Sequence, residues 1–98
     1  MDNSAHPGRR LKVAAPADTF QRAMDLLKWT SNAPRWYMLP DEIYRDCDRE
    51  VDAMFDAYLF DEGRWDVMSV DYGENSIILT LYDAEDDVTM YIDIVPEN

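Results

Sequence analysis

The hydrophobic pattern in the first half of the chain predicts two helices. Four apolar side chains follow the i, i+3, i+4, i+7 spacing of one helix face: Phe20, Ala23, Met24 and Leu27. This stripe predicts a helix over 18–29. After Pro40, apolar side chains again recur every three or four residues, from Ile43 to Leu59. The second stripe predicts a longer helix over 41–60.

In the second half, apolar and polar residues alternate with the period of two that is typical of strands. The alternation predicts three strands, over 65–72, 76–82 and 88–95. The turn at 73–75 is short and contains glycine, as a hairpin requires, and the turn at 83–87 is acidic. Consecutive strands joined by such short turns form an antiparallel meander.

Two parts of this pattern leave alternatives open. Residues 12–15 form either a short extended segment or a lead-in to the first helix, and we expect 1–11 to be a flexible arm. The first predicted strand can turn either of two pairs toward the core: Trp65 and Val67, or Met68 and Val70.

The predicted fold class is α+β, in the order α-α-β-β-β. Two helices pack on one face of a three-stranded antiparallel sheet, and 12–98 form a single compact domain. The opposite face of this sheet carries a mixture of polar and apolar side chains: Ile78, Thr80, Tyr82, Thr89, Tyr91 and Asp93. Such a face can pair with a second copy to give a homodimer, with a partner, or with residues 30–40.

The connection 30–40 contains Pro34 and Pro40, which bar a continuous helix. It is rich in large side chains: Trp36, Tyr37, Met38 and Leu39. The segment either covers the core or forms a binding ledge. On the second interpretation, Trp36 and Tyr37 anchor a partner, because Trp and Tyr are enriched at interface hot spots.

Charge changes this picture more than any motif does. The chain of 98 residues has 21 acidic and nine basic side chains, and its net charge is −12. That charge exceeds the roughly 2–8 units usual for a small domain. Direct binding to nucleic acid is therefore not expected, because it requires a basic surface. The acidic residues are concentrated after residue 40, where the chain has 18 acidic residues and only three arginines.

The sequence indicates no enzyme, no cofactor and no metal site. His6, the single histidine, falls in the expected arm, whereas a general base requires fixed geometry. Cys47 lies on an apolar stripe, where a cysteine usually serves as a small hydrophobic residue. The acidic turn 83–87 lacks the glycine of a calcium-binding loop. The three glycines are isolated and form no phosphate-binding loop.

The location of the protein follows from two absences in the sequence. Its longest apolar runs are only a few residues, far below the roughly 20 that span a bilayer. The N-terminal residues contain no apolar stretch of the kind found in secretion signals. We therefore expect a cytoplasmic protein.

The acidic residues of the second helix are the candidate partner-binding site. Asp48, Asp52 and Asp56 are spaced by four, so neighbours lie about 6 Å apart along a helix, close to the spacing of phosphates on a strand. The complete set that we expect to act as phosphate surrogates includes the acidic turn: Asp41, Glu42, Asp46, Asp48, Asp52, Asp56, Asp83, Glu85, Asp86 and Asp87. A solvated helix face is the alternative meaning of such a row.

In size and charge the chain resembles a class of small acidic proteins without catalytic motifs. The class includes phage-encoded DNA mimics that block restriction or CRISPR effectors, and immunity proteins that neutralise nuclease toxins. The resemblance implies a non-enzymatic inhibitor that binds a basic nucleic-acid-binding surface of a protein or nucleoprotein complex. The alternatives are an immunity protein and a self-associating structural or assembly protein.

Overall fold

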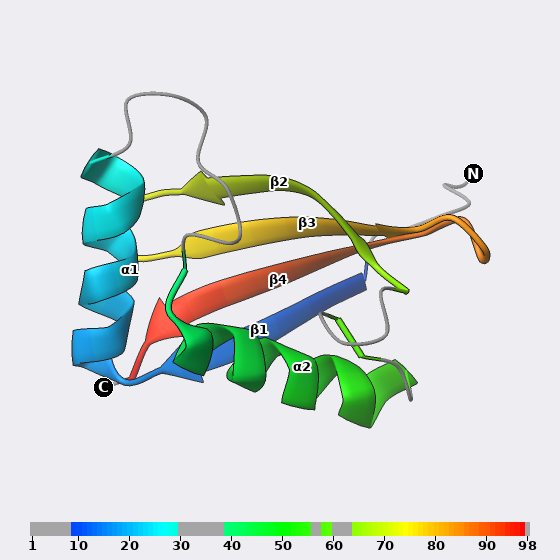
Figure 1. Ribbon diagram of the computed structural model, residues 1–98, viewed down its shortest axis with the longest axis horizontal. Helices are drawn as coiled ribbons and strands as arrows, with labels where there is room; N and C mark the ends of the chain where they lie inside the picture. The colour runs from blue at the N-terminus through cyan, green and yellow to red at the C-terminus, as the bar shows by residue number, and fades with distance from the viewer. Residues whose placement is uncertain (1–8, 30–38, 56–57, 60–63, 98) are drawn as a thin grey trace.

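The computed structural model describes residues 9–29, 39–55, 58–59 and 64–97 (Figure 1). Its elements follow the chain in the order β1 (Arg9–Ala15), α1 (Ala17–Trp29), α2 (Asp41–Phe55), β2 (Asp66–Tyr72), β3 (Ile77–Asp83) and β4 (Val88–Pro96). The α+β class is therefore as predicted, and α1 and the last three strands lie where the sequence pattern places them.

The sheet has four strands in the order β1-β4-β3-β2, and β1 runs parallel to β4. The prediction of three antiparallel strands is therefore wrong in detail: β2, β3 and β4 form the expected meander, and β1 adds a parallel edge. The strand begins at Arg9, within the range expected for the arm, and 1–8 lie outside the described residues. Its partner strand is distant in sequence, so no local pattern indicates this pairing.

The core lies between one face of the sheet and the two helices. Side chains of β3 alternate strictly, with Ile77, Leu79 and Leu81 fully buried. The five buried residues of α1 include the whole predicted stripe, and those of α2 are Ile43, Cys47 and Val51. The buried apolar residues form one cluster with the sheet, so both helices cover the same face.

The first strand of the meander contains a bulge, which resolves its ambiguous alternation. The register shifts between Val67 and Ser69, so the intervening Met68 has no ladder partner and is 63% exposed. Val67 and Val70 pair with core residues of β3 on either side of the bulge. A bulge inserts one extra residue into one strand, which is why neither simple alternation fits this segment.

The second helix is shorter than its apolar stripe predicts. It ends at Phe55, and Tyr58 and Leu59 lie outside it. The Leu59 amide donates a hydrogen bond to Asp48 Oδ1 at 2.7 Å, and the Leu59 side chain is 2% exposed. The apolar stripe continues past the end of the helix because Leu59, which follows the helix, is also buried in the core.

Neither α1 nor α2 is long and apolar enough to cross a membrane.

Candidate acidic interface

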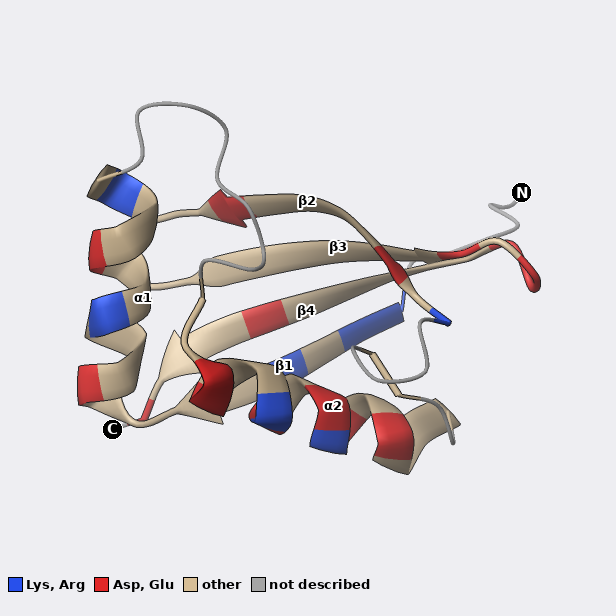
Figure 2. Cartoon of the chain, in the orientation of Figure 1, with Lys and Arg blue, Asp and Glu red and all other residues tan. Residues whose placement is uncertain are grey.

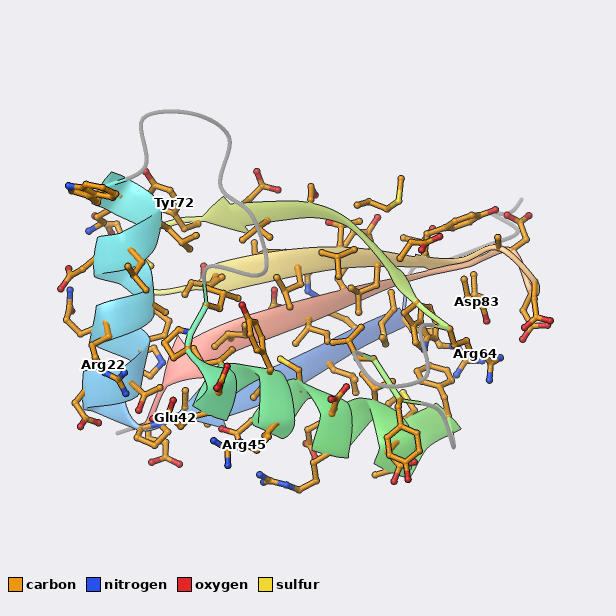
Figure 3. All side chains as sticks on the ribbon, in the orientation of Figure 1. Arg22, Glu42, Arg45, Arg64, Tyr72 and Asp83 are labelled. Carbon is orange, nitrogen blue, oxygen red and sulfur yellow. The ribbon has the colours of Figure 1, made fainter. Side chains whose placement is uncertain are left out.

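The first turn of α2 combines two exposed carboxylates with a contact from α1. Asp41 and Glu42 begin the helix, where negative charge is favoured by the helix dipole. The pKa of Glu42 is lowered by a hydrogen bond from its own backbone amide and then by Arg22. Arg22 Nη2 lies 3.0 Å from Glu42 Oε2, so this ion pair joins α1 to α2 (Figure 3).

The expected row of carboxylates on α2 is used partly by the fold itself. Asp48 accepts a hydrogen bond from the Leu59 amide, and the Asp48 side chain is only partly exposed. Asp46 pairs with Arg49 at 2.6 Å, and its side chain is 20% exposed. Asp52 is half-buried, and Asp56 lies outside the described residues. Of Asp46, Asp48 and Asp52, Asp52 is the one that makes no ion pair or hydrogen bond with another described residue.

Glu50 belongs to this surface although the sequence analysis did not single it out. It is exposed, as is Asp41, and neither makes an ion pair with another described residue. Figure 2 shows that basic residues interrupt the acidic ones along α2, and in the sequence these are Arg45 and Arg49, both exposed. The helix therefore presents a mixed surface with an acidic excess, carried by Asp41, Glu50 and Asp52.

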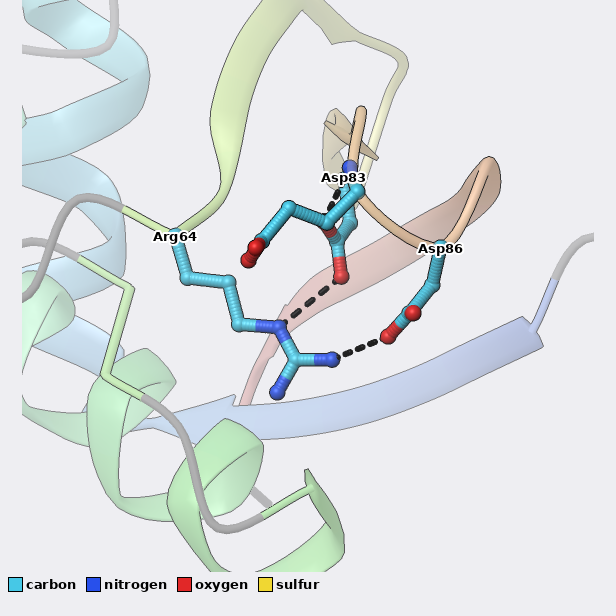
Figure 4. Close-up of polar contacts among 4 residues, drawn as sticks. Arg64, Asp83 and Asp86 are labelled. Carbon is cyan, nitrogen blue, oxygen red and sulfur yellow. Dashed lines mark hydrogen bonds and ion pairs between the residues drawn. The ribbon is translucent and has the colours of Figure 1, made fainter.

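The acidic turn between β3 and β4 is held by a single arginine. Arg64 Nε donates to Asp83 Oδ2 at 2.8 Å, and Arg64 Nη2 donates to Asp86 Oδ2 (Figure 4). Asp83 is 1% exposed, so it is placed in the interior and not on the surface where a phosphate surrogate is needed. We therefore leave Asp83 out of the candidate interface.

Burial alone raises the pKa of the Asp83 carboxyl, because desolvation disfavours the charged form. Hydrogen bonds from Arg64 and from the Glu85 amide, which lies 3.0 Å from Asp83 Oδ1, outweigh this effect. The resulting pKa lies below the ordinary value, so the carboxylate stays charged in the folded protein.

Three carboxylates remain on the outside of this turn. Glu85, Asp86 and Asp87 are exposed residues, and Asp86 is also the second partner of Arg64. Asp87 has a φ of 52°, a left-handed conformation that aspartate tolerates better than most residues. The Tyr82 hydroxyl donates to Asp87 Oδ1 at 2.7 Å, and this bond raises the pKa of Tyr82. The turn is thus a rigid acidic tip.

A pocket of about 290 Å³ lies between α2 and this tip. Its lining includes Arg9, whose guanidinium lies 5.4 Å from the centre of the Phe55 ring, and Arg64. The indole nitrogen of Trp65, in the same wall, is buried without a hydrogen-bond partner. Two cations therefore lie between the acidic surface of α2 and the acidic tip, so the two groups of predicted residues are separate patches.

The expected aromatic anchors, Trp36 and Tyr37, lie outside the described residues. The outer side of α1 carries a different large aromatic residue, Trp29, which is 84% exposed. Together with Arg22, Asp25 and Leu26, Trp29 lines a shallow, mostly apolar pocket of about 420 Å³. Leu26 and Trp29 are apolar residues off the buried stripe, which is the signal in the sequence that points to this surface.

The structure bears on two of the chemistries considered from the sequence, a reactive cysteine and a metal site. Burial, followed by the nearby carboxylates Asp46, Asp48 and Glu50, raises the pKa of the Cys47 thiol well above its ordinary value. A nucleophilic cysteine requires the opposite shift. No group of three potential metal ligands occurs among the residues that the structure describes.

Comparisons with protein-family models, with curated proteins and with solved structures gave no match. Function is therefore argued from the charge and geometry of this chain alone.

Proposed function

We propose that this protein is a non-enzymatic, acidic inhibitor that binds a basic nucleic-acid-binding surface of a protein or nucleoprotein complex. It blocks that surface to DNA or RNA, in the manner of a DNA mimic of the phage anti-restriction or anti-CRISPR type. Its place of action is the cytoplasm.

The observation that carries the proposal is the acidic excess on the exposed surface of α2. Asp41, Glu50 and Asp52 make no ion pair with another described residue, and they sit on a helix anchored by three buried residues. This surface has a negative excess on a helix whose other side is packed into the core. Such a field speeds encounter with a basic partner.

The acidic tip supplies a second contact, and Trp29 supplies an apolar one. Glu85 and Asp87 project from a turn that Arg64 and Tyr82 hold in place. Trp29 is exposed on α1, and tryptophan is among the residues most often found at the energetic centre of interfaces. Together these features supply both long-range attraction and a short-range anchor.

The test is a competition experiment on captured partners. The tagged protein is incubated with nuclease-treated host lysate, and bound proteins are eluted with duplex DNA, with RNA or with stepped salt. Release of a nucleic-acid-binding protein by added nucleic acid supports the proposal. A partner that nucleic acid fails to displace contradicts it, and a single small nuclease as the partner favours an immunity protein.

A matched pair of variants separates the α2 surface from net charge. The test variant combines Asp41→Asn, Glu50→Gln and Asp52→Asn. The control combines Asp18→Asn, Glu74→Gln and Glu97→Gln, three exposed acids outside α2 that do not line the Trp29 pocket, so both variants lose the same charge.

We expect the test variant to bind the captured partner at least about tenfold more weakly and the control to change little, because charge pairs act at short range in salt. Affinity would be measured by titration calorimetry. Equal losses for the two variants would show that only net charge matters, and no loss for either would exclude this surface.

A further inference from the structure

The face of the sheet opposite the helices has a regular chemical order across its four strands. Paired residues in a sheet point to the same side, so the register defines rows that cross the face. One row runs Lys12, Asp93, Ile78 and Asp71, from β1 through β4 and β3 to β2. The neighbouring row runs Arg10, Tyr91, Thr80 and Ser69.

The two edges of this face carry opposite charge. On β1 it bears Arg10 and Lys12, and on β2 it bears Asp66 and Asp71. Figure 2 shows basic residues on β1 and acidic residues on β2. The middle consists of half-buried side chains of mixed polarity: Ile78, Thr80, Tyr82, Thr89, Tyr91 and Val95. The face therefore runs from a basic edge, across a middle with two tyrosines, to an acidic edge.

Neither described helix covers this face. The buried residues of α1 and α2 all belong to the cluster on the other side of the sheet. Figure 1 shows both helices against that side, with α1 across the strand ends and α2 along β1. The charged edges and the tyrosines thus lie on one side of the sheet, and the acidic surface of α2 lies on the other.

We propose that this face binds a second copy of the chain, with the two-fold axis parallel to the strands. This axis places the basic β1 edge of each copy over the acidic β2 edge of the other. Each row of residues in one copy then lies over the same row of the other copy, in reverse order. Lys12 then faces Asp71 of the second copy, and the same contact occurs twice. An in-plane axis perpendicular to the strands would instead place β1 over β1, with like charges opposed. Charge complementarity therefore selects one symmetric arrangement.

The charge between the edges is already balanced within each copy. Asp93, in the middle of its row, accepts two hydrogen bonds from Arg10, at 2.7 and 3.0 Å. The Arg10 guanidinium also lies 5.5 Å from the centre of the Tyr91 ring. The middle of the face therefore presents the Arg10–Asp93 ion pair, which has no net charge, and the tyrosine rings. Lys12 and Asp71 remain for contacts between copies.

The size of the face sets the strength to expect. Strands about 4.8 Å apart and residues about 3.3 Å apart give a four-stranded face of roughly 19 by 23 Å. That is roughly half the area that each partner buries in an interface of standard size. The dimer should therefore be weak, with a dissociation constant in the micromolar range, and it should form as protein concentration rises.

Analytical ultracentrifugation at about 0.15 M salt, with the protein varied from about 1 to 500 µM, tests the proposal. The variants Lys12→Asp and Asp71→Lys each place like charges opposite one another, so each alone should raise the dissociation constant at least about tenfold. Mixing the two variants should restore association, because both contacts in the mixed dimer again join opposite charges. The doubly substituted chain should also dimerise.

Matched controls make the same charge changes elsewhere. Lys28→Asp and Asp25→Lys lie on exposed positions of α1, and they should leave the dissociation constant of the dimer unchanged. Thr80→Lys places a charge in the middle of the face without reversing an edge, and it should abolish association. Circular dichroism confirms that each variant is folded.

A monomer at every concentration would overturn the proposal. So would a dimer that Thr80→Lys leaves intact, since that dimer uses another surface. Failure of the mixture to restore association would reject the assigned axis. None of these outcomes bears on the acidic surface of α2, which lies on the other side of the sheet.

Discussion

At the scale of single residues, the least exposed charge among the described residues belongs to Asp83, at the end of β3. Its carboxylate is 1% exposed and bonds to Arg64 and to the Glu85 amide. A buried carboxylate is tolerated only where hydrogen bonds replace water, and here both of its oxygens accept one. Asp83 therefore fixes the acidic tip in place without forming part of its surface.

The pKa of Asp83 predicts how stability changes in acid. The pKa of Asp83 in the folded protein lies below the ordinary value of 3.8, so its charged carboxylate stabilises the fold above pH 3.8. This contribution to the free energy of unfolding is lost as the pH falls through the folded pKa. At neutral pH, Asp83→Asn should lower the free energy of unfolding by about 2–3 kcal/mol, because a charged hydrogen bond is lost. Urea unfolding measured from pH 7 to pH 2.5 provides both results.

Asp86→Asn is the control, because Asp86 bonds to the same arginine from an exposed position. An exposed pair contributes at most about 1 kcal/mol, so this variant should remain close to the wild type. The difference between wild type and Asp83→Asn should shrink as the pH falls below 3.8. A constant difference across the whole range would contradict the assigned ion pair.

At the scale of elements, sequence pattern is reliable where the partner of a segment is local. The stripes of α1 and α2 and the alternation of β3 predict these elements because the helix and hairpin periods are visible within a few residues. Strand β1 is anticipated only as the extended alternative for residues 12–15, because its partner is the distant β4, and Met68 obscures β2 because one inserted residue reverses the alternation. Asp48 looks like a surface acid in the sequence, and only the structure shows that it accepts a hydrogen bond from the Leu59 amide.

The contact between Asp48 and Leu59 predicts a change in stability at the end of α2. Asp48→Ala should lower the free energy of unfolding by about 1–2 kcal/mol, because the Leu59 amide loses its acceptor. Asp52→Ala, one turn further along the same helix, should change it by less than about 0.5 kcal/mol. Thermal unfolding of the two variants, followed by circular dichroism, measures the comparison. Equal losses for both would mean that helix charge and not this hydrogen bond is responsible.

At the scale of the whole molecule, the candidate site was predictable in its charge but not in its arrangement. Composition alone indicates an acidic surface, because 18 acids follow residue 40. It does not indicate that Arg9 and Arg64 divide that surface, because these residues meet only when β1 and the segment before β2 converge on one pocket. The opposite charges of the two sheet edges are also not predictable from composition, because they become visible only once the register of β1 with β4 is known.

The net charge of the molecule predicts how its association with a partner depends on salt. If the acidic surfaces steer the protein to a basic partner, the association rate constant should fall steeply between about 0.05 and 0.3 M salt, since the screening length shortens over this range. The dissociation rate should change much less, because it reports contacts already formed. Stopped-flow measurements with the captured partner separate the two rates. An association rate that is independent of salt would contradict steering.

The parallel pairing of β1 with β4 also affects how the protein is made. Arg10 and Asp93, which hold the first and last strands together, are 83 residues apart. At synthesis rates of about 5–20 residues per second, the first strand waits roughly 4–17 s for its neighbour. During that time the β1 edge has no strand to pair with, and its arginines and lysine hinder aggregation with other nascent chains. The basic edge thus protects the unfinished chain on the ribosome.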